Sequence, residues 1–230
     1  MHQLIPLALT IFSAMALGQT YEAQYDMTWN VGVRLEAKAT ETLKKTGDLY
    51  EIVLHADASI GSVTEASNLL YSPKMGWKPL DYSYTQNLLG RTTGRHFRFN
   101  WNKDIVSRMH ESEQTHSPIL DGTFDPLGFR LQLAHLLKSG QPLPQKITII
   151  DGDDFKTWEI AVRGSDLLET PMGALKTKKY SLIDSNFDSY GSFYFWLAPS
   201  LDYQLVRLEK KDNKRLLTLT LTAFQPSNNP

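Results

Sequence analysis

One short helix pattern, in a chain that otherwise alternates like β-strands, is the feature that most constrains the fold. It spans residues 121–140, where Asp125 is a good N-cap and Pro126 occupies the first helical position. Gly140 can supply the left-handed residue that ends such a helix. Around it we expect about a dozen antiparallel strands. The sequence therefore predicts a mainly β fold, with a strongly curved antiparallel sheet (an open or partly closed barrel) around one central α-helix.

Alternation of apolar and polar side chains identifies most of the strands. Residues 21–29 place apolar side chains on one face and polar ones on the other, as a half-buried strand requires. Residues 33–40 alternate in the same way, and Gly47 marks the hairpin turn that follows. Residues 64–71 are ambiguous between a helical turn and a strand. The polar stretch 110–122 is expected to form a mobile loop.

The predicted helix is apolar over more than half of its circumference, so we expect it to be largely enclosed. The residues expected on its polar side are Gly128, Gln132, His135 and Lys138. Arg130 falls inside the apolar arc, which allows two interpretations. Its stem packs while the guanidinium reaches a rim or a carboxylate, or the cation faces a cavity, ready for an anionic head group.

Aromatic side chains are more numerous than one side of a thin sheet needs. Either they pack against the helix, or helix and sheet leave an apolar slot that holds a hydrophobic, lipid-like small molecule. The ligand-binding candidates are apolar walls and one head-group contact: Phe129, Leu133, Phe97, Trp101 and Trp196, with Arg130.

The N-terminus resembles an export signal. Residues 4–17 form an apolar run with small residues at its end, and it is too short to span a bilayer. We expect residues 1–18 to be a signal peptide, residues 19–225 one β domain, and residues 226–230 a frayed tail. No Cys follows the run for lipid attachment, so the product is expected to be soluble, periplasmic or secreted, and without a lipid anchor.

Composition and motifs exclude several functions. The chain has no Cys, which removes disulfides and thiolate chemistry. Its 24 basic and 25 acidic residues leave it nearly neutral, which argues against nucleic-acid binding. No later segment is long enough to be transmembrane, and no nucleophile motif of the hydrolases is present. We therefore expect a protein without catalytic residues, metal or cofactor.

Two clusters of acidic or histidine side chains are metal-binding candidates. Asp151, Asp153 and Asp154 flank a glycine, which suits Ca²⁺, although Asp-Gly is also a common hairpin turn. His110, Glu111, Glu113 and His116 have metal-capable side chains, but neither the i,i+4 spacing of a helical metal site nor supporting residues around the ligands are visible. We interpret the first group as a turn and the second as part of the polar loop.

Four motifs in this order resemble a bacterial exported family known as domain of unknown function 3108. They are Trp77-Lys78-Pro79-Leu80 with Tyr82, Asp125-Pro126-Leu127, Glu169-Thr170-Pro171-Met172-Gly173, and Phe195-Trp196-Leu197-Ala198-Pro199. The chain departs from the pattern at Gly128 and Met172. The resemblance covers nearly all of the chain after the signal peptide. It implies an exported, mainly β protein, similar in fold to the periplasmic lipoprotein carriers, and transfers no catalytic residue.

These observations favour a non-enzymatic protein that binds or carries a hydrophobic ligand between helix and sheet. The alternative is an interaction protein of envelope assembly, which would use an exposed strand edge or the 110–122 loop.

Overall fold

The computed structural model describes residues 20–30, 34–110, 113–120, 122–184, 192–212 and 215–227. The expected signal peptide and the last residues of the tail lie outside this described part. The elements, in chain order, are β1 (Thr20–Asn30), β2 (Arg34–Thr46), β3 (Leu49–Ala58), β4 (Gly61–Ser72), β5 (Gly76–Leu88), β6 (Arg91–Asn100), β7 (Ile105–His110), β8 (Glu113–Pro118), β9 (Thr123–Phe124), α1 (Pro126–Lys138), β10 (Lys146–Asp151), β11 (Asp154–Thr170), β12 (Gly173–Asp184), β13 (Ser192–Ala198), the 3₁₀ turn η1 (Pro199–Leu201), β14 (Gln204–Asp212) and β15 (Arg215–Ser227).

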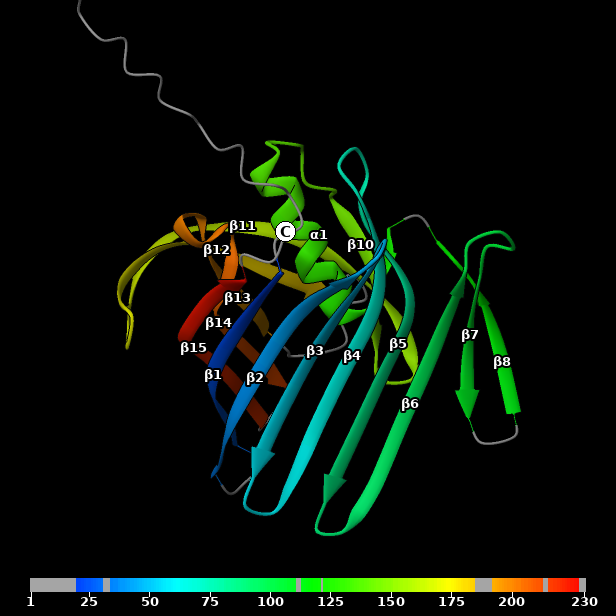
Figure 1. Cartoon of the computed structure of the whole chain (residues 1–230), viewed down its shortest axis with the longest axis horizontal. Coiled ribbons are helices and arrows are strands. Elements are labelled where there is room, and N and C mark those ends of the chain that lie inside the picture. The colour runs from blue at the N-terminus through cyan, green and yellow to red at the C-terminus, as the bar shows by residue number, and fades with distance from the viewer. Residues whose placement is uncertain are drawn as a thin grey trace, which may run out of the picture.

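The described strands form a single 15-stranded sheet in the order β8-β7-β6-β5-β4-β3-β2-β1-β15-β14-β13-β12-β11-β10-β9. All neighbours are antiparallel except β9 and β10, which are parallel. Neighbours in the sheet are also neighbours in the chain, apart from β1 and β15. The sheet is strongly curved and stays open between β8 and β9, which is the open form of the two that the sequence predicted (Figure 1).

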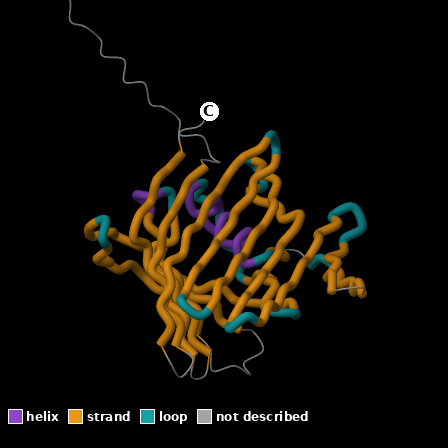
Figure 2. The backbone as a smooth tube through the Cα atoms, turned by 60° about the horizontal axis from the view of Figure 1, so that its bottom comes forward, coloured by secondary structure: helices purple, strands orange, loops and turns teal. Residues whose placement is uncertain are grey.

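The alternation seen in the sequence sets the two faces of the sheet. Tyr21, Ala23 and Tyr25 of β1 are buried, whereas Glu22 and Gln24 are exposed. The buried residues of successive strands face the hollow of the sheet and meet the helix there. Figures 1 and 2 show α1 lying within this hollow, where it packs against β4, β5, β9 and β10. The predicted central helix is therefore confirmed.

The structure assigns strands to residues 64–71 and to much of 110–122. The ambiguous stretch 64–71 is part of β4. The expectation of a mobile loop over residues 110–122 was wrong for most of that stretch, because β7 and β8 form an antiparallel hairpin there. Edge strands need only backbone pairing on one side, so a polar sequence can still extend a sheet.

The described strands form two arms of the sheet, β1 to β8 and β9 to β15, which pair only through β1 and β15. Elsewhere, side chains join the two arms. Asp153, in the turn between β10 and β11, accepts from Arg95 Nε at 2.7 Å and pairs with Arg108 Nη2 at 2.8 Å. Beside this pair, Phe97 and Phe155 rings contact edge to face, with centroids 6.2 Å apart. The Asp-Gly turn is thus an ion-paired hairpin, and the described residues contain no group of three or more acidic or His side chains able to hold a metal ion.

Among the described residues no helix is long and apolar enough to cross a membrane.

Candidate functional site

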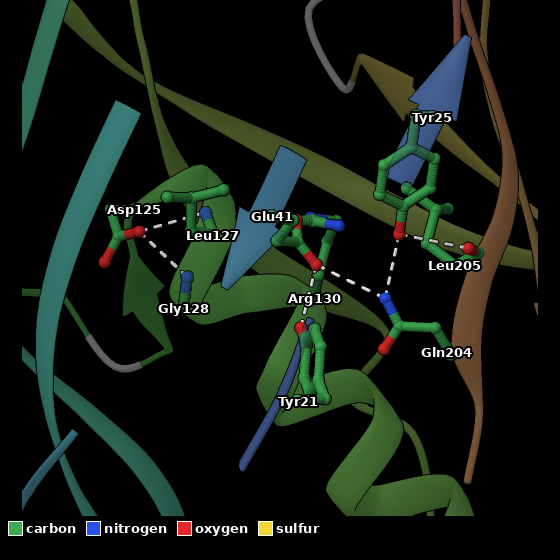
Figure 3. Close-up of polar contacts among 9 residues, drawn as sticks. All are labelled: Tyr21, Tyr25, Glu41, Asp125, Leu127, Gly128, Arg130, Gln204 and Leu205. Atoms are coloured by element: carbon green, nitrogen blue, oxygen red, sulfur yellow. Dashed lines mark hydrogen bonds and ion pairs between the residues drawn. The ribbon is translucent and has the colours of Figure 1, made fainter. Parts of the chain in front are cut away.

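The start of α1 is fixed by a buried cap. Asp125 is fully buried, and its Oδ1 accepts from the backbone N–H of Leu127 at 2.9 Å and of Gly128 at 2.8 Å (Figure 3). Its Oδ2 accepts from the Ser67 hydroxyl at 2.8 Å, which ties the helix to β4. Burial raises the pKa of Asp125 to about 6, against the lowering effect of these hydrogen bonds. The cap therefore sets the position of the helix as well as its start.

The helix is enclosed on more sides than its sequence indicates. Leu127, Phe129 and Leu133 are buried as expected, but Gly128 and His135, predicted on the polar side, are buried too. Gln132 Oε1 accepts a hydrogen bond from the backbone N–H of Trp77 at 2.7 Å, so the predicted polar side packs on the start of β5. A sheet that curves around the helix covers faces that a flat sheet would leave in water.

Arg130 has a buried partner in β2. Its Nη2 forms an ion pair with Glu41 Oε2, and the Glu41 side chain has no exposed surface (Figure 3). The first interpretation of Arg130, a stem that packs while its head meets a carboxylate, is therefore the one observed. Burial alone would lower the pKa of Arg130, but the Glu41 carboxylate raises it above its ordinary value. The guanidinium stays charged and is held in place.

A small polar network completes this pair. Tyr21 donates its hydroxyl to Glu41 Oε1 at 2.8 Å, and Gln204 Nε2 lies 3.3 Å from the same oxygen. Gln204 also donates to the Tyr25 hydroxyl at 2.8 Å, which in turn donates to the Leu205 carbonyl at 3.2 Å (Figure 3). Burial, reinforced by the nearby Glu41 charge, raises the pKa of both tyrosines. The network joins β1, β2 and β14 to the helix.

Of the three cavities that flank α1 in the described part of the chain, two are lined by Arg130. The first, of about 370 Å³, lies at the N-terminal half of the helix and is called here the Glu65 cavity. The second, of about 410 Å³, lies at the C-terminal half and is called the His135 cavity. Both volumes fall in the range of small-molecule sites, about 300–1,000 Å³.

The Glu65 cavity has mostly apolar walls drawn from the helix and from both arms of the sheet. Its lining residues are Leu54, Glu65, Tyr82, Tyr84, Arg95, Pro126, Leu127, Phe129, Arg130, Ile149, Ile150, Gly152, Trp158, Phe193, Phe195, Leu205, Leu208, Lys210, Leu217 and Leu219. Glu65 is the one acidic side chain among them. Burial raises its pKa to about 7, although Arg130 acts in the opposite direction. A carboxyl group in this position is held between its neutral and charged forms near neutral pH.

The His135 cavity differs in its polar groups. Both ring nitrogens of His135 and the Tyr71 hydroxyl are buried without a hydrogen-bond partner within the described chain. The two rings contact edge to face, with centroids 5.7 Å apart. Burial lowers the pKa of His135, so the imidazole is neutral. Because these three polar atoms are covered by neighbouring atoms, a ligand in the cavity would contact the carbon atoms of the two rings.

The structure brings together only some of the residues that the sequence grouped as one site. Phe129 and Arg130 line the Glu65 cavity, and Phe129 and Leu133 line the third cavity, of about 420 Å³. None of these three cavities is lined by Phe97, Trp101 or Trp196.

Those three aromatic side chains have other neighbours. Phe97 belongs to the cluster that joins β5, β6 and β7 to β10, and Trp101 stacks on Phe99 and donates to the Pro79 carbonyl at 2.6 Å. Trp196 follows Phe195 in β13 and so points to the opposite face, where it donates to Asp166 at 2.7 Å. We therefore leave all three out of the candidate site. The sequence did not identify Glu65, which lines the cavity. It also did not identify Glu41, the partner of Arg130, or Tyr21 and Gln204, which bond to Glu41.

One of the two edges of the sheet, formed by β8, is poorly suited to pairing with another chain. The edge strand β8 carries polar residues and ends at Pro118, which has no N–H to donate. Natural proteins use such polar, proline-ended strands to discourage pairing with another chain.

A family described as "Protein of unknown function (DUF3108)" matches residues 24–222. The chain belongs to the DUF3108 family. The resemblance that the motifs indicated is thereby confirmed over nearly all of the described residues. Among curated proteins, none matches this member of the family.

Solved structures show a related fold. A beta-barrel-like protein of the DUF1849 family from Brucella abortus has a TM-score of 0.61 at 10% identity, covering 92% of this chain and 99% of that one. At this identity the similarity concerns the fold alone. A DUF1329 family protein from Desulfovibrio piger has a TM-score of 0.27 at 9% identity, covering 93% and 88% of the two chains.

A domain from Vibrio parahaemolyticus, described as an outer membrane lipoprotein-sorting protein, also has a TM-score of 0.27, at 8% identity, covering 94% and 88% of the two chains. Scores this low support no argument about this DUF3108 member.

Proposed function

We propose that this DUF3108 protein is an exported, non-enzymatic binding protein that holds a hydrophobic, lipid-like ligand in the Glu65 cavity. The observation that carries the proposal is the cavity itself, about 370 Å³ of space between Phe129 of the helix and apolar residues of both arms of the sheet. Pockets that hold small apolar ligands combine such walls with a few polar groups.

The composition of the walls favours binding over catalysis. No Ser, Thr or His lines the Glu65 cavity, so it contains no hydroxyl nucleophile with a histidine base beside it. Arg130, proposed from the sequence as the head-group contact, is paired with Glu41 and serves as a fixed part of the wall.

The first 18 residues support an envelope location. Their apolar run and small residues suit a signal peptide, which would release a soluble chain of one β domain into the periplasm or medium. No Cys is available there for a lipid anchor.

Binding of an apolar fluorophore tests the proposal. The mature protein should enhance the fluorescence of N-phenyl-1-naphthylamine, and Leu54→Trp, which fills the Glu65 cavity, should weaken binding at least about tenfold, a loss of about 1.4 kcal/mol. Ala134→Trp fills the His135 cavity and is the matched control, expected to bind like the parent. Thermal unfolding of each variant checks that it is folded, since overpacking costs about 1–3 kcal/mol. Equal binding by the parent and Leu54→Trp, or no binding by the parent, would reject the proposal.

A further inference from the structure

Some polar groups of the Glu65 cavity already have partners on the protein, and others do not. Arg130 is paired with Glu41, and Arg95 is paired with Asp153. The Tyr84 hydroxyl donates to Gln86 at 3.0 Å. These groups already have partners on the protein and are held by them.

Glu65 and Tyr82 are different. Within the described part of the chain, neither the Glu65 carboxyl nor the Tyr82 hydroxyl has a hydrogen-bond or ion-pair partner, although both line the cavity. Neither is among the polar atoms sealed off from solvent, so both are open to the cavity. Both side chains come from neighbouring strands, since Glu65 pairs with Tyr84 in the register of β4 and β5 and Tyr82 lies two residues before it.

This arrangement resembles the polar end of an otherwise apolar pocket. Glu65 is partly buried, and a partly buried carboxyl without a protein partner is costly unless a ligand supplies the missing hydrogen bonds. An ionised carboxylate only accepts hydrogen bonds, whereas a tyrosine hydroxyl both donates and accepts. A ligand group that donates to Glu65 satisfies the carboxylate, and a second carboxylate in the same place would repel it.

We infer that Glu65, with the Tyr82 hydroxyl beside it, selects an amphiphile whose polar end is a hydrogen-bond donor, an ammonium or a hydroxyl group, rather than a carboxylate. This inference rests on the proposed function, because it assumes that the apolar part of the ligand occupies the same cavity. The charge-assisted bond to an ammonium group is the stronger of the two.

Four probes of equal chain length separate the possible head groups. They are dodecylamine, dodecanol, dodecanoate and dodecyltrimethylammonium, each used below the concentration at which it forms micelles and measured by calorimetry at pH 8.5. We expect dodecylamine to bind most tightly and dodecanol next, with the other two at least about tenfold weaker than the amine. Dodecyltrimethylammonium carries the charge without an N–H, so it isolates the contribution of the hydrogen bond.

Glu65→Gln keeps the shape of the side chain and removes its charge. It should weaken dodecylamine binding about tenfold while leaving dodecanol within about threefold of the parent. Tyr82→Phe should weaken both probes by removing the neighbouring hydroxyl. Glu51→Gln is the matched control, because Glu51 is an exposed acid on the adjacent strand β3 and lies outside both cavities.

The pH dependence gives an independent readout. Dodecylamine is protonated throughout the range, whereas a carboxyl group with a pKa of about 7 is mostly neutral at pH 5.5, so amine binding by the parent should fall by just under about tenfold between pH 8.5 and 5.5, towards the level of Glu65→Gln. Other charged or titratable groups face Glu65 from the helix and the sheet: Asp125, Arg130, Glu41, Lys210, Tyr82, Tyr84 and Arg95. Glu65→Gln retains all of these and should lose most of the pH dependence.

The outcomes distinguish this inference from the proposed function. If none of the four probes binds, both are overturned. If the probes bind but dodecanoate is preferred, or if Glu65→Gln binds dodecylamine like the parent, only the head-group assignment is overturned.

Discussion

Removing the Arg130 guanidinium should cost far more stability than removing another cation from the same helix. In Arg130→Met the Glu41 carboxylate stays fully buried and loses its only ion-pair partner among the described residues, keeping hydrogen bonds from Tyr21 and Gln204. Breaking a buried pair in this way costs about 3–5 kcal/mol. That is a large share of the total stability of a domain, about 5–15 kcal/mol.

The helix supplies its own control. Lys138 pairs with Asp202 at 2.9 Å, but the two side chains are 26% and 44% exposed, so Lys138→Met should cost about 1 kcal/mol or less. The combination of Glu41→Gln with Arg130→Met removes both charges and should recover about 2 kcal/mol of the single-variant loss. Urea titration at pH 7 gives the free energy of unfolding of the parent, the two single variants and the double variant. If Arg130→Met costs no more than Lys138→Met, the pair does not hold the helix in the hollow.

Three further substitutions test the surroundings of the helix. Leu133→Ala should lower the free energy of unfolding by about 2–5 kcal/mol in urea titrations, because Leu133 is only 2% exposed; an unchanged midpoint would place the helix outside the core. Glu65→Gln should raise the free energy of unfolding by about 3 kcal/mol at pH 8.5 and leave it nearly unchanged at pH 4. The sign follows from a folded-state pKa of about 7 against an ordinary value of 4.5, so the parent loses stability as the pH rises through this window; equal effects at both pH values would contradict it. Gly76→Ala should lower the melting temperature, with a cost above about 1 kcal/mol, because a Cβ there would lie 2.1 Å from Gln132 Oε1 on a backbone with φ +80; a parent-like melting curve would show that the contact relaxes freely.

The limits of the helix could be predicted from the sequence because their signals are local. Asp125 caps the first turn, Pro126 follows it, and Gly140 takes a left-handed conformation just beyond the last turn. The strands of the N-terminal half could be predicted for the same reason, since alternation is a property of a few neighbouring residues. The covering of His135 depends on the curvature of the whole sheet, which no local pattern specifies.

The partner of Arg130 was within reach of sequence analysis. Leu35, Ala37 and Ala39 mark the inward face of β2, and the same alternation continues to Glu41. A charged residue at an inward position, in a chain whose helix also carries a cation on its apolar face, predicts a buried pair. What the sequence lacks is the distance in space between residues that lie 89 positions apart.

Glu65 and Trp196 show two other limits. The ambiguity of residues 64–71 left no strand register from which to place Glu65 inside the cavity. The run from Phe193 to Leu197 is apolar on both faces, so composition alone assigns Phe195 and Trp196 to one wall, whereas alternation separates them.

The order of the strands has a consequence for how the chain can fold. Each strand from β2 to β8 can pair with the one before it as soon as it is made, and the strands from β10 to β15 can do the same. β1 pairs with β2 on one side, but its other side must wait for β15, whose residues follow its own by about 200 positions, as in the pairing of Thr20 with Ser227. Until the last strand arrives, β1 exposes an unpaired edge of the kind that promotes aggregation. The final thirteen-residue strand is therefore the segment whose arrival completes the ladder, and a chain that lacks it leaves two halves with no backbone connection through the sheet.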